Sequence, residues 1–207
     1  MIRVLLADDH ALVREGLKQL LAATADLRVE AEAANGDEAL ALAKANDYDL
    51  AVLDMSMPGL AGIELIKRLR AEKPRLRLLV LSMHGEAQYA ARALKAGAAG
   101  YVTKDSASAQ LVSAIRKVAA GGVHIGEAAA AQLIGAPRSD AAPHTRLSNR
   151  EFEVFRLLVA GRGPTEIAGT LHLSVKTVST HKTRIFEKMG VESVADLVRY
   201  AVTNKLS

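Results

Sequence analysis

The stretch LAVLDMSMPG, residues Leu50–Gly59, decides the fold of this chain. Its apolar first half, which includes the β-branched Val52, predicts a short buried strand, and Pro58–Gly59 predicts the turn that ends it. Asp54 stands where this strand ends. A carboxylate is costly to bury inside a sheet, but at the carboxyl-terminal edge of a parallel sheet, where ligands bind, it can meet water or a cation. Asp54 is therefore a candidate site residue, although a single acid at the end of a strand is usually an exposed turn residue.

Two further acids follow the first apolar run of the chain. Ile2–Ala7 predicts a strand, Asp8–Asp9 come directly after it, and a helical pattern of apolar residues then begins with Leu12. A single acid would be enough to cap that helix. The second, adjacent acid adds repulsion, so the pair favours a cation shared with Asp54 over a capping role.

Strands and helices alternate along the first part of the chain. Beyond the two strands above, apolar runs predict strands at Arg28–Ala33, Leu78–Leu81 and Tyr101–Thr103. The helices predicted after the five strands cover residues 11–23, 37–45, 63–71, 87–95 and 109–119. Five such units predict a doubly wound parallel sheet of the flavodoxin-like α/β class.

The strand order 2-1-3-4-5, which this class uses, makes the first and third strands neighbours. It brings Asp8, Asp9 and Asp54 together, and the fourth and fifth strands add Ser82 and Lys104 at the same edge. Three carboxylates so close repel one another and need a divalent cation, a lysine or both. Oxygen ligands favour Mg²⁺. Lys104 and Ser82 can hold phosphoryl oxygens, and a carboxylate such as Asp54 can be the nucleophile that forms an aspartyl-phosphate.

The composition excludes several classes of protein. The 207 residues contain no cysteine, which removes disulfides, thiolate metal sites and cysteine nucleophiles. No run approaches the roughly 18 apolar residues of a membrane span, and acids at the eighth and ninth positions do not fit a signal peptide. We therefore expect a cytoplasmic protein with no membrane partner.

The chain divides into two domains and a joint. Residues 1–121 hold the alternating units, and residues 122–145 have the Pro-, Ser- and Ala-rich composition of a linker, with one short helix predicted at Glu127–Ile134. Residues 146–207 show helical patterns only. Residues 1–126 carry 16 Lys and Arg against 15 Asp and Glu, and the shorter remainder carries 11 against 8. The basic excess therefore lies in the second domain.

The second domain contains a helix-turn-helix pattern. A capping box, Ser148-Asn-Arg-Glu151, opens its first helix. Pro164 suits the first turn of a short helix that runs to Leu171. Ser174 then caps a longer basic helix, Val175–Met189. A short helix, a tight turn and a longer helix of this kind describe a helix-turn-helix unit, which binds DNA in the major groove.

The longer helix has an apolar stripe of Val178, Ile185 and Met189 and a polar face. Lys and Arg on such a face can hold phosphates, while Ser and Thr can approach base edges. On spacing alone, an ordinary solvated face of a small helical bundle is an equally good explanation. The candidate DNA contacts are Lys176, Thr177, Ser179, Thr180, Lys182, Thr183, Arg184 and Lys188.

The motifs ADDH, LDMSMPG, LVLSMH and GYVTKD resemble the receiver domain of two-component response regulators, over the whole first domain. The resemblance implies that Asp54 accepts a phosphoryl group from a sensor histidine kinase. It also implies that Asp8 and Asp9 bind Mg²⁺ together with Asp54 and the main-chain carbonyl of Ser56, and that Lys104 pairs with the phosphoryl group.

The same resemblance makes Ser82 and Tyr101 a switch pair, in which the hydroxyl moves toward the phosphoryl group and the aromatic ring follows. One position departs from the family. Many receivers have Pro after the Lys, in a cis peptide, whereas Asp105 follows Lys104 here. Because a cis bond without proline costs a few kcal/mol, the geometry of this bond stays open.

The motifs LSNREFEVFRLLVAG, EIAGTLHLSVKTVSTHKTRIFEKMGV and ADLVRYAV resemble the LuxR-type domain of NarL/FixJ response regulators. The resemblance places Ser179, Thr180 and Thr183 at base-facing positions. It also matches His181 to a histidine of the family's recognition helix, where the side chain suits a phosphate or packing contact. Ser179 replaces a common Lys and Gly163–Pro164 replace Ser-Asn, which leaves the operator sequence open.

Together the two resemblances imply a transcription factor that phosphorylation controls. The receiver covers the recognition helix until Asp54 is phosphorylated, and two copies then pair on double-stranded DNA with inverted half-sites. The apolar residues of the last helix, Ser193–Val202, are the candidates for this homodimer contact. They are Val194, Leu197, Val198 and Ala201.

Three alternatives come from other classes of protein. A flavodoxin-like phosphatase would have an acid two residues after its nucleophile, where Ser56 stands, and would turn over substrate; we expect at most weak self-dephosphorylation. A LuxR-type regulator that senses a small molecule has no use for three acids at one edge. A receiver of the same fold that works without phosphate remains open.

Overall fold

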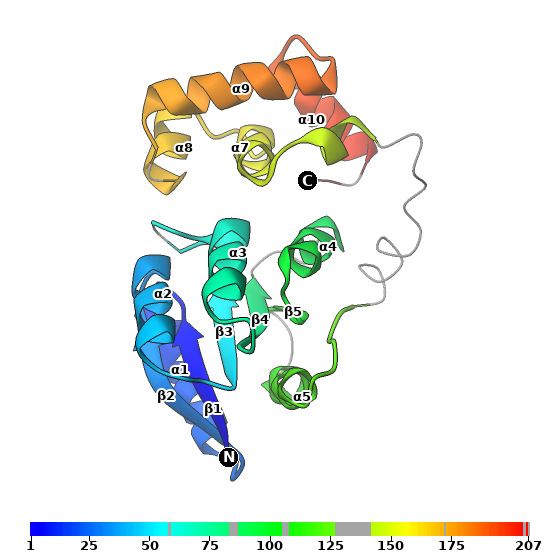
Figure 1. The fold of residues 1–207 in the computed structure, drawn as a ribbon. Coiled ribbons are helices and arrows are strands. Elements are labelled where there is room, and N and C mark those ends of the chain that lie inside the picture. Colours follow the sequence, from blue (N-terminus) through cyan, green and yellow to red (C-terminus); the bar gives the residue numbers. More distant parts are fainter. Residues whose placement is uncertain are drawn as a thin grey trace. The chain divides into compact units, whose positions relative to one another are not determined.

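The computed structural model describes residues 1–57, 59–82, 87–104, 108–126, 142–171, 173–204 and 206 (Figure 1). The chain forms two compact units, Met1–Gly135 and Ala136–Ser207. Three of the predictions lie outside the described residues: the turn at Pro58, the helix at Glu127–Ile134 and the geometry of the Lys104–Asp105 bond. Within the described part, no helix has both the length and the apolar character needed to cross a bilayer.

The first unit is built on a five-stranded parallel sheet. Its strands are β1 (Ile2–Ala7), β2 (Leu27–Ala33), β3 (Leu50–Asp54), β4 (Arg77–Ser82) and β5 (Gly100–Thr103). Their order in the sheet is β2-β1-β3-β4-β5, and every pair is parallel. This confirms the predicted doubly wound sheet and the adjacency of β1 and β3.

Helices cover both faces of this sheet (Figure 1). The helices α1 (Ala11–Ala22) and α5 (Ser108–Ala119) pack on one face, where Leu21 and Ile115 meet the strand residues Val4 and Leu79. The other face carries α2 (Gly36–Ala45), α3 (Gly62–Glu72) and α4 (Ala87–Ala96). The core is aliphatic, as the composition predicts. Leu12 of the first predicted apolar pattern lies outside this core and is 88% exposed.

The second unit is a small helical bundle. After a 3-10 turn, η1 (Pro143–Arg146), it contains α7 (Asn149–Val159), α8 (Pro164–Leu171), α9 (Val175–Met189) and α10 (Val194–Thr203). The predicted capping box is present, because Ser148 Oγ accepts the Glu151 N–H and Glu151 Oε2 accepts the Ser148 N–H. Ser174 caps α9, and Gly190, with φ of 66°, ends it. The short helix α8 and the longer α9 confirm the helix-turn-helix prediction.

Residues near both ends of the predicted linker, residues 122–145, make contacts with the neighbouring units. His124 forms a parallel bridge with Gly100, donates its N–H to the Ala99 carbonyl (3.0 Å), and accepts the N–H of Tyr101 (2.9 Å). At the other end, His144 Nδ1 lies 2.6 Å from the Tyr200 hydroxyl of α10. Composition suggested a free joint here because it does not report which backbone groups an edge strand can bind.

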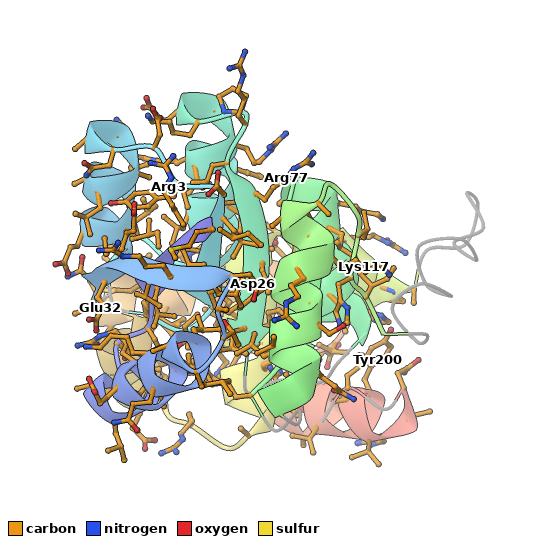
Figure 2. The ribbon with its side chains drawn as sticks, turned by 90° about the horizontal axis from the view of Figure 1, so that it is seen from below. Arg3, Asp26, Glu32, Arg77, Lys117 and Tyr200 are labelled. Carbon is orange, nitrogen blue, oxygen red and sulfur yellow. The ribbon has the colours of Figure 1, made fainter. Side chains whose placement is uncertain are left out.

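The amino-terminal edge of the sheet carries exposed ion pairs, and one member of each of two pairs, Arg3 and Asp26, is labelled in Figure 2. Arg3 donates its backbone N–H to Asp49 Oδ2 (2.7 Å). Asp26 receives two bonds from the Arg116 guanidinium, at 2.7 and 2.8 Å. Exposed pairs of this kind contribute little stability each, about 1 kcal/mol or less. The buried charges of the first unit lie at the opposite edge.

The start of α2 supports the loop between β3 and α3, which contains Ser56. Gly36 is buried there, and a Cβ on it would lie 1.5 Å from the Leu60 carbonyl oxygen. The neighbouring Asp37 accepts the Leu60 N–H through Oδ2 (3.2 Å). The absence of a side chain at Gly36 therefore allows the loop to approach α2 closely.

We expect Gly36→Ala to lower the free energy of unfolding by about 1–3 kcal/mol, because backbone atoms must move to make room for the methyl group. Gly16→Ala is the matched control, since Gly16 lies on α1 with no atom within 4 Å of the added carbon. That variant should gain about 0.5–1 kcal/mol from its higher helix propensity. Urea unfolding measures both, and a Gly36→Ala protein as stable as wild type would contradict the packing argument.

Candidate functional site

The carboxyl-terminal edge of the sheet brings together acids and a lysine from three strands. Asp8 follows β1 and is 1% exposed, Asp54 ends β3 and is 2% exposed, and Lys104 follows β5. The Lys104 Nζ lies 2.6 Å from Asp8 Oδ2 and 3.1 Å from Asp54 Oδ2. The predicted convergence of strand ends is confirmed, and a lysine is one of the charges that compensate the acids.

Neither of the first two acids caps α1. The N-cap residue is His10, whose side chain makes no capping bond. Asp8 instead accepts the His10 N–H through Oδ1 (2.9 Å), and its carbonyl accepts a bond from the Arg14 guanidinium (2.6 Å). Asp9 lies nearer the surface. The capping interpretation is therefore excluded, and the turn after β1 holds Asp8 toward Asp54.

Burial and the neighbouring opposite charges shift the pKa values of Asp54 and Lys104 in opposite directions. Burial raises the pKa of Asp54, and Asp8 raises it further, whereas Lys104 and the backbone of Ser56 lower it. The net pKa of Asp54 lies above its ordinary value. Burial alone would lower the pKa of Lys104, but its pairs with Asp8 and Asp54 outweigh burial and raise it. The lysine therefore stays charged, and the ionised form of Asp54 is incompletely compensated.

The oxygens that Lys104 leaves over fit a divalent cation. Asp8, Asp9, His10 and Asp54 each offer one ligand atom, and these four atoms lie within 4.8 Å of one another. Asp54 Oδ1 is buried without a hydrogen-bond partner, which is costly for a carboxylate oxygen. Oxygen atoms of this kind are the ligands that Mg²⁺ prefers. His10 was not among the residues predicted for this site.

The two predicted switch residues lie on adjacent strands. Ser82 is buried at the end of β4, and Tyr101 is buried on β5. Tyr101 pairs with Val80, two residues before Ser82. Because side chains two residues apart on a strand share a face, Ser82 and Tyr101 point to the same side of the sheet. The Ser82 carbonyl also accepts the Lys104 N–H (2.7 Å), which ties the switch pair to the acidic edge.

The second candidate site is the polar face of α9. Val178, Ile185 and Met189 are buried, as predicted. Among the candidate DNA contacts, six residues are exposed: Lys176, Ser179, Thr180, Thr183, Arg184 and Lys188. The three hydroxyls donate to backbone carbonyls one turn earlier, at 3.0–3.2 Å. They are thus held against the helix with their oxygens still available to accept bonds.

Lys188 and Thr177 were predicted as DNA contacts, but both have partners inside the second unit. Lys188 Nζ lies 2.6 Å from Oε2 of Glu151, which is buried. Burial would raise the pKa of Glu151, but Lys188 and Ser148 more than offset it and hold that pKa below its ordinary value. Thr177 Oγ1 lies 2.8 Å from Ser174 Oγ at the cap of α9. Both side chains therefore stabilise the fold.

The remaining predicted residues of α9 are His181 and Lys182. His181 is half-buried, and burial lowers its pKa, with Arg150 and Arg184 acting in the same direction and Glu151 against it. A neutral, half-buried ring favours the packing role among the two predicted for it. Lys182 Nζ lies 5.4 Å from the centre of the Phe186 ring, which holds its charge beside the exposed face.

Two of the four residues predicted for the dimer contact are buried. Leu197 and Ala201 are 0% exposed because they pack inside their own unit, so they have no surface for a partner. Val194 and Val198 are half-buried, and Val202, one turn further along α10, is 63% exposed. The apolar surface that α10 offers is therefore the row Val194, Val198 and Val202.

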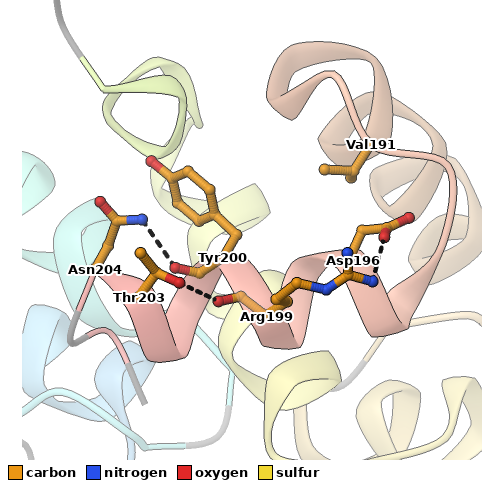
Figure 3. A pocket seen from close by; sticks show the side chains of 6 residues that line it. All are labelled: Val191, Asp196, Arg199, Tyr200, Thr203 and Asn204. Carbon is orange, nitrogen blue, oxygen red and sulfur yellow. Dashed lines mark hydrogen bonds and ion pairs between the residues drawn. The ribbon is translucent and has the colours of Figure 1, made fainter.

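A pocket of about 270 Å³ also lies beside α10 (Figure 3). Its polar side chains bind within the helix, as when Thr203 donates to the Arg199 carbonyl (2.9 Å) and Arg199 pairs with Asp196 (3.1 Å). Its lining is Val191, Asp196, Arg199, Tyr200, Thr203 and Asn204. None of the predicted site residues lines it.

Comparison with known families assigns both units. Residues 4–116 match the response regulator receiver domain, and residues 145–201 match the luxR family of bacterial regulatory proteins. The response regulator UvrY of Escherichia coli K12 is 34% identical over 100% of this chain and 96% of its own length. The response regulator GacA of Pseudomonas viridiflava is 38% identical over 98% of this chain and 96% of its own length.

A solved structure agrees with these matches. RcsB of Salmonella enterica serovar Typhimurium, bound to the promoter rprA in the presence of the phosphomimetic BeF₃⁻, is 28% identical over 96% of this chain and 97% of that one, with a TM-score of 0.66. The receiver match precedes the luxR-family match along this chain, and both relatives align with nearly all of it. The chain therefore belongs to the two-component response regulators of the NarL/FixJ type, which join a receiver domain to a LuxR-type DNA-binding domain.

Proposed function

We propose that this response regulator is a transcription factor whose Asp54 accepts a phosphoryl group from a sensor histidine kinase. The observation that carries the proposal is the arrangement at Asp54. This carboxylate is buried beside Lys104, yet its Oδ1 has no hydrogen-bond partner. A buried nucleophile with a cation beside it and one unpartnered oxygen is suited to attack a phosphoryl group.

The transfer forms one bond and breaks one. One carboxylate oxygen of Asp54 forms the new O–P bond while the P–N bond of the kinase phosphohistidine breaks and its electron pair returns to the imidazole. Lys104 would pair with a phosphoryl oxygen, and the Ser82 hydroxyl would donate to another. Asp8, Asp9, Asp54 and the Ser56 carbonyl would hold Mg²⁺, which neutralises charge on the phosphoryl oxygens when bound.

The phosphoryl group adds a charge of about −1.5 to −2 at Asp54, which can bias a two-state element. In our proposal Ser82 moves toward the new oxygens and Tyr101 follows. The change releases the helix-turn-helix unit from the receiver and allows two copies to pair. Since Leu197 and Ala201 are inside their own unit, we assign the pairing to Val194, Val198 and Val202.

The exposed face of α9 would then enter the major groove. Its hydroxyls would meet base edges, while its basic side chains would hold phosphates. A homodimer with twofold symmetry would bind inverted half-sites. The promoter-bound RcsB structure supports DNA as the partner. The proposed base contacts are Ser179, Thr180 and Thr183, and the proposed phosphate contacts are Lys176, Lys182 and Arg184.

Incubation with labelled acetyl phosphate and Mg²⁺ should yield at most one phosphoryl group per chain, and Asp54→Ala should abolish it. Asp47→Ala is the control, because Asp47 pairs with Lys73 at the surface and should leave labelling unchanged. Label on the Asp54→Ala protein would remove Asp54 from its role. Unlabelled wild type would favour a receiver that works without phosphate, and consumption far beyond one equivalent would favour a phosphatase.

Without divalent cations, Asp54→Asn should raise the free energy of unfolding of the receiver at pH 7. Because the folded pKa of Asp54 is raised, its ionisation destabilises the fold once the pH exceeds the unfolded value of 3.8. The gain should therefore vanish as the pH falls below about 4. Mg²⁺ should stabilise wild type more than the variant.

Urea unfolding followed by circular dichroism measures these differences. Asp47→Asn is the control, since its exposed pair with Lys73 should contribute little to stability. An Asp54→Asn protein that is less stable than wild type at pH 7 without metal would contradict the assigned electrostatics.

Lys182→Ala should weaken binding to random-sequence duplex DNA and reduce the slope of log K against log salt by about 0.9, the contribution of one phosphate contact. Fluorescence anisotropy across a salt series measures the slope. Lys67→Ala, an exposed lysine on α3 of the receiver, is the control and should leave the slope unchanged. An unchanged slope for Lys182→Ala would mean that this side chain contacts no phosphate.

A further inference from the structure

His10 lies at the acidic edge, and the proposed phosphoryl transfer gives its side chain no role. The imidazole is 64% exposed, and it makes no capping bond to α1. Its Nδ1 lies 2.9 Å from Asp9 Oδ1 and 3.3 Å from Asp8 Oδ1. The nitrogen therefore faces the two carboxylates, while the rest of the ring reaches solvent.

These separations are those of neighbouring ligands around one ion. With metal–ligand bonds of about 2.1 Å, adjacent corners of an octahedron are about 3.0 Å apart and opposite corners about 4.2 Å. The two distances from His10 Nδ1 match the adjacent spacing. The four candidate ligand atoms all lie within 4.8 Å of one another, so a shift of about 0.6 Å would bring the widest pair to the opposite spacing.

The other contacts of the acids leave carboxylate oxygens without a hydrogen-bond partner beside His10, and these could bind an ion. Lys104 lies near one oxygen each of Asp8 and Asp54. Asp54 Oδ1, in a residue that is 98% buried, has no hydrogen-bond partner. Asp9 Oδ1 has none either, although His10 Nδ1 is 2.9 Å away, because the geometry between them is not that of a hydrogen bond.

We infer that His10 supplies Nδ1 as a nitrogen ligand beside the three carboxylates, and that the site therefore binds a first-row transition-metal cation more tightly than Mg²⁺. Imidazole nitrogen suits transition metals, whereas Mg²⁺ prefers oxygen and retains several waters. The inference rests on the proposed function, since it concerns the cation that would assist transfer to Asp54.

Mn²⁺ is the probe, because its electron spin reports directly on bound nitrogen. Electron spin-echo modulation of the full-length protein with Mn²⁺ should show coupling to a ¹⁴N nucleus, and His10→Ala should lose it. The exposed, non-capping side chain of His10 leaves the fold of the variant intact, which circular dichroism checks. Wild type without ¹⁴N coupling, or coupling that survives in His10→Ala, would overturn the inference.

Titration calorimetry gives an independent readout. His10→Ala should weaken Mn²⁺ binding about tenfold and change Mg²⁺ binding by less than about twofold. Asp54→Asn is the matched variant and should weaken the binding of both ions, because it removes the negative charge of a carboxylate that both would use. If Asp54→Asn weakens both ions and His10→Ala weakens neither, or both equally, the inference fails and the proposed function stands. If wild type binds neither ion, both fail.

Discussion

The ion pairs of Lys104 with Asp8 and Asp54 are the constraint on which the receiver depends. One ammonium group faces two nearly buried carboxylates, with a third acid close by. The compensation is incomplete, because the pKa of Asp54 stays raised despite the lysine. Such a cluster exists only if β1, β3 and β5 end at one edge, which the strand order provides. The fold thus holds an excess of negative charge at the place where a cation or a phosphoryl group would bind.

The sequence predicted the receiver well because the strands that carry the site, β1, β3, β4 and β5, are apolar runs with a polar residue at or directly after their end. Asp8, Asp54 and Lys104 could be placed from that pattern and the order of strands alone. His10 could not, because an exposed histidine beside two acids has many ordinary roles. The pairing of His124 with β5 could not be predicted either, because it uses backbone atoms, and composition does not report which backbone groups pair.

The second domain shows where helical patterns become ambiguous. An amphipathic helix reveals its apolar residues but not which of them its own bundle buries. Leu197 and Ala201 fell on the buried side, and this depends on how α10 packs against α7. Lys188 belonged to a basic run, yet its partner Glu151 lies on another helix and was known only as a capping residue. Side chains of α9 thus divide between holding the bundle and offering a surface.

The bridge between Gly100 and His124 has a consequence for the border of the sheet. An outer strand exposes backbone N–H and C=O groups that can recruit a strand of another molecule. Here the Tyr101 N–H and the Ala99 carbonyl are already bound by His124 of the same chain. A receiver cut after α5 would leave these groups bare and invite self-association. The few residues after α5 therefore protect this edge from pairing with a strand of another molecule, and an isolated receiver should retain them.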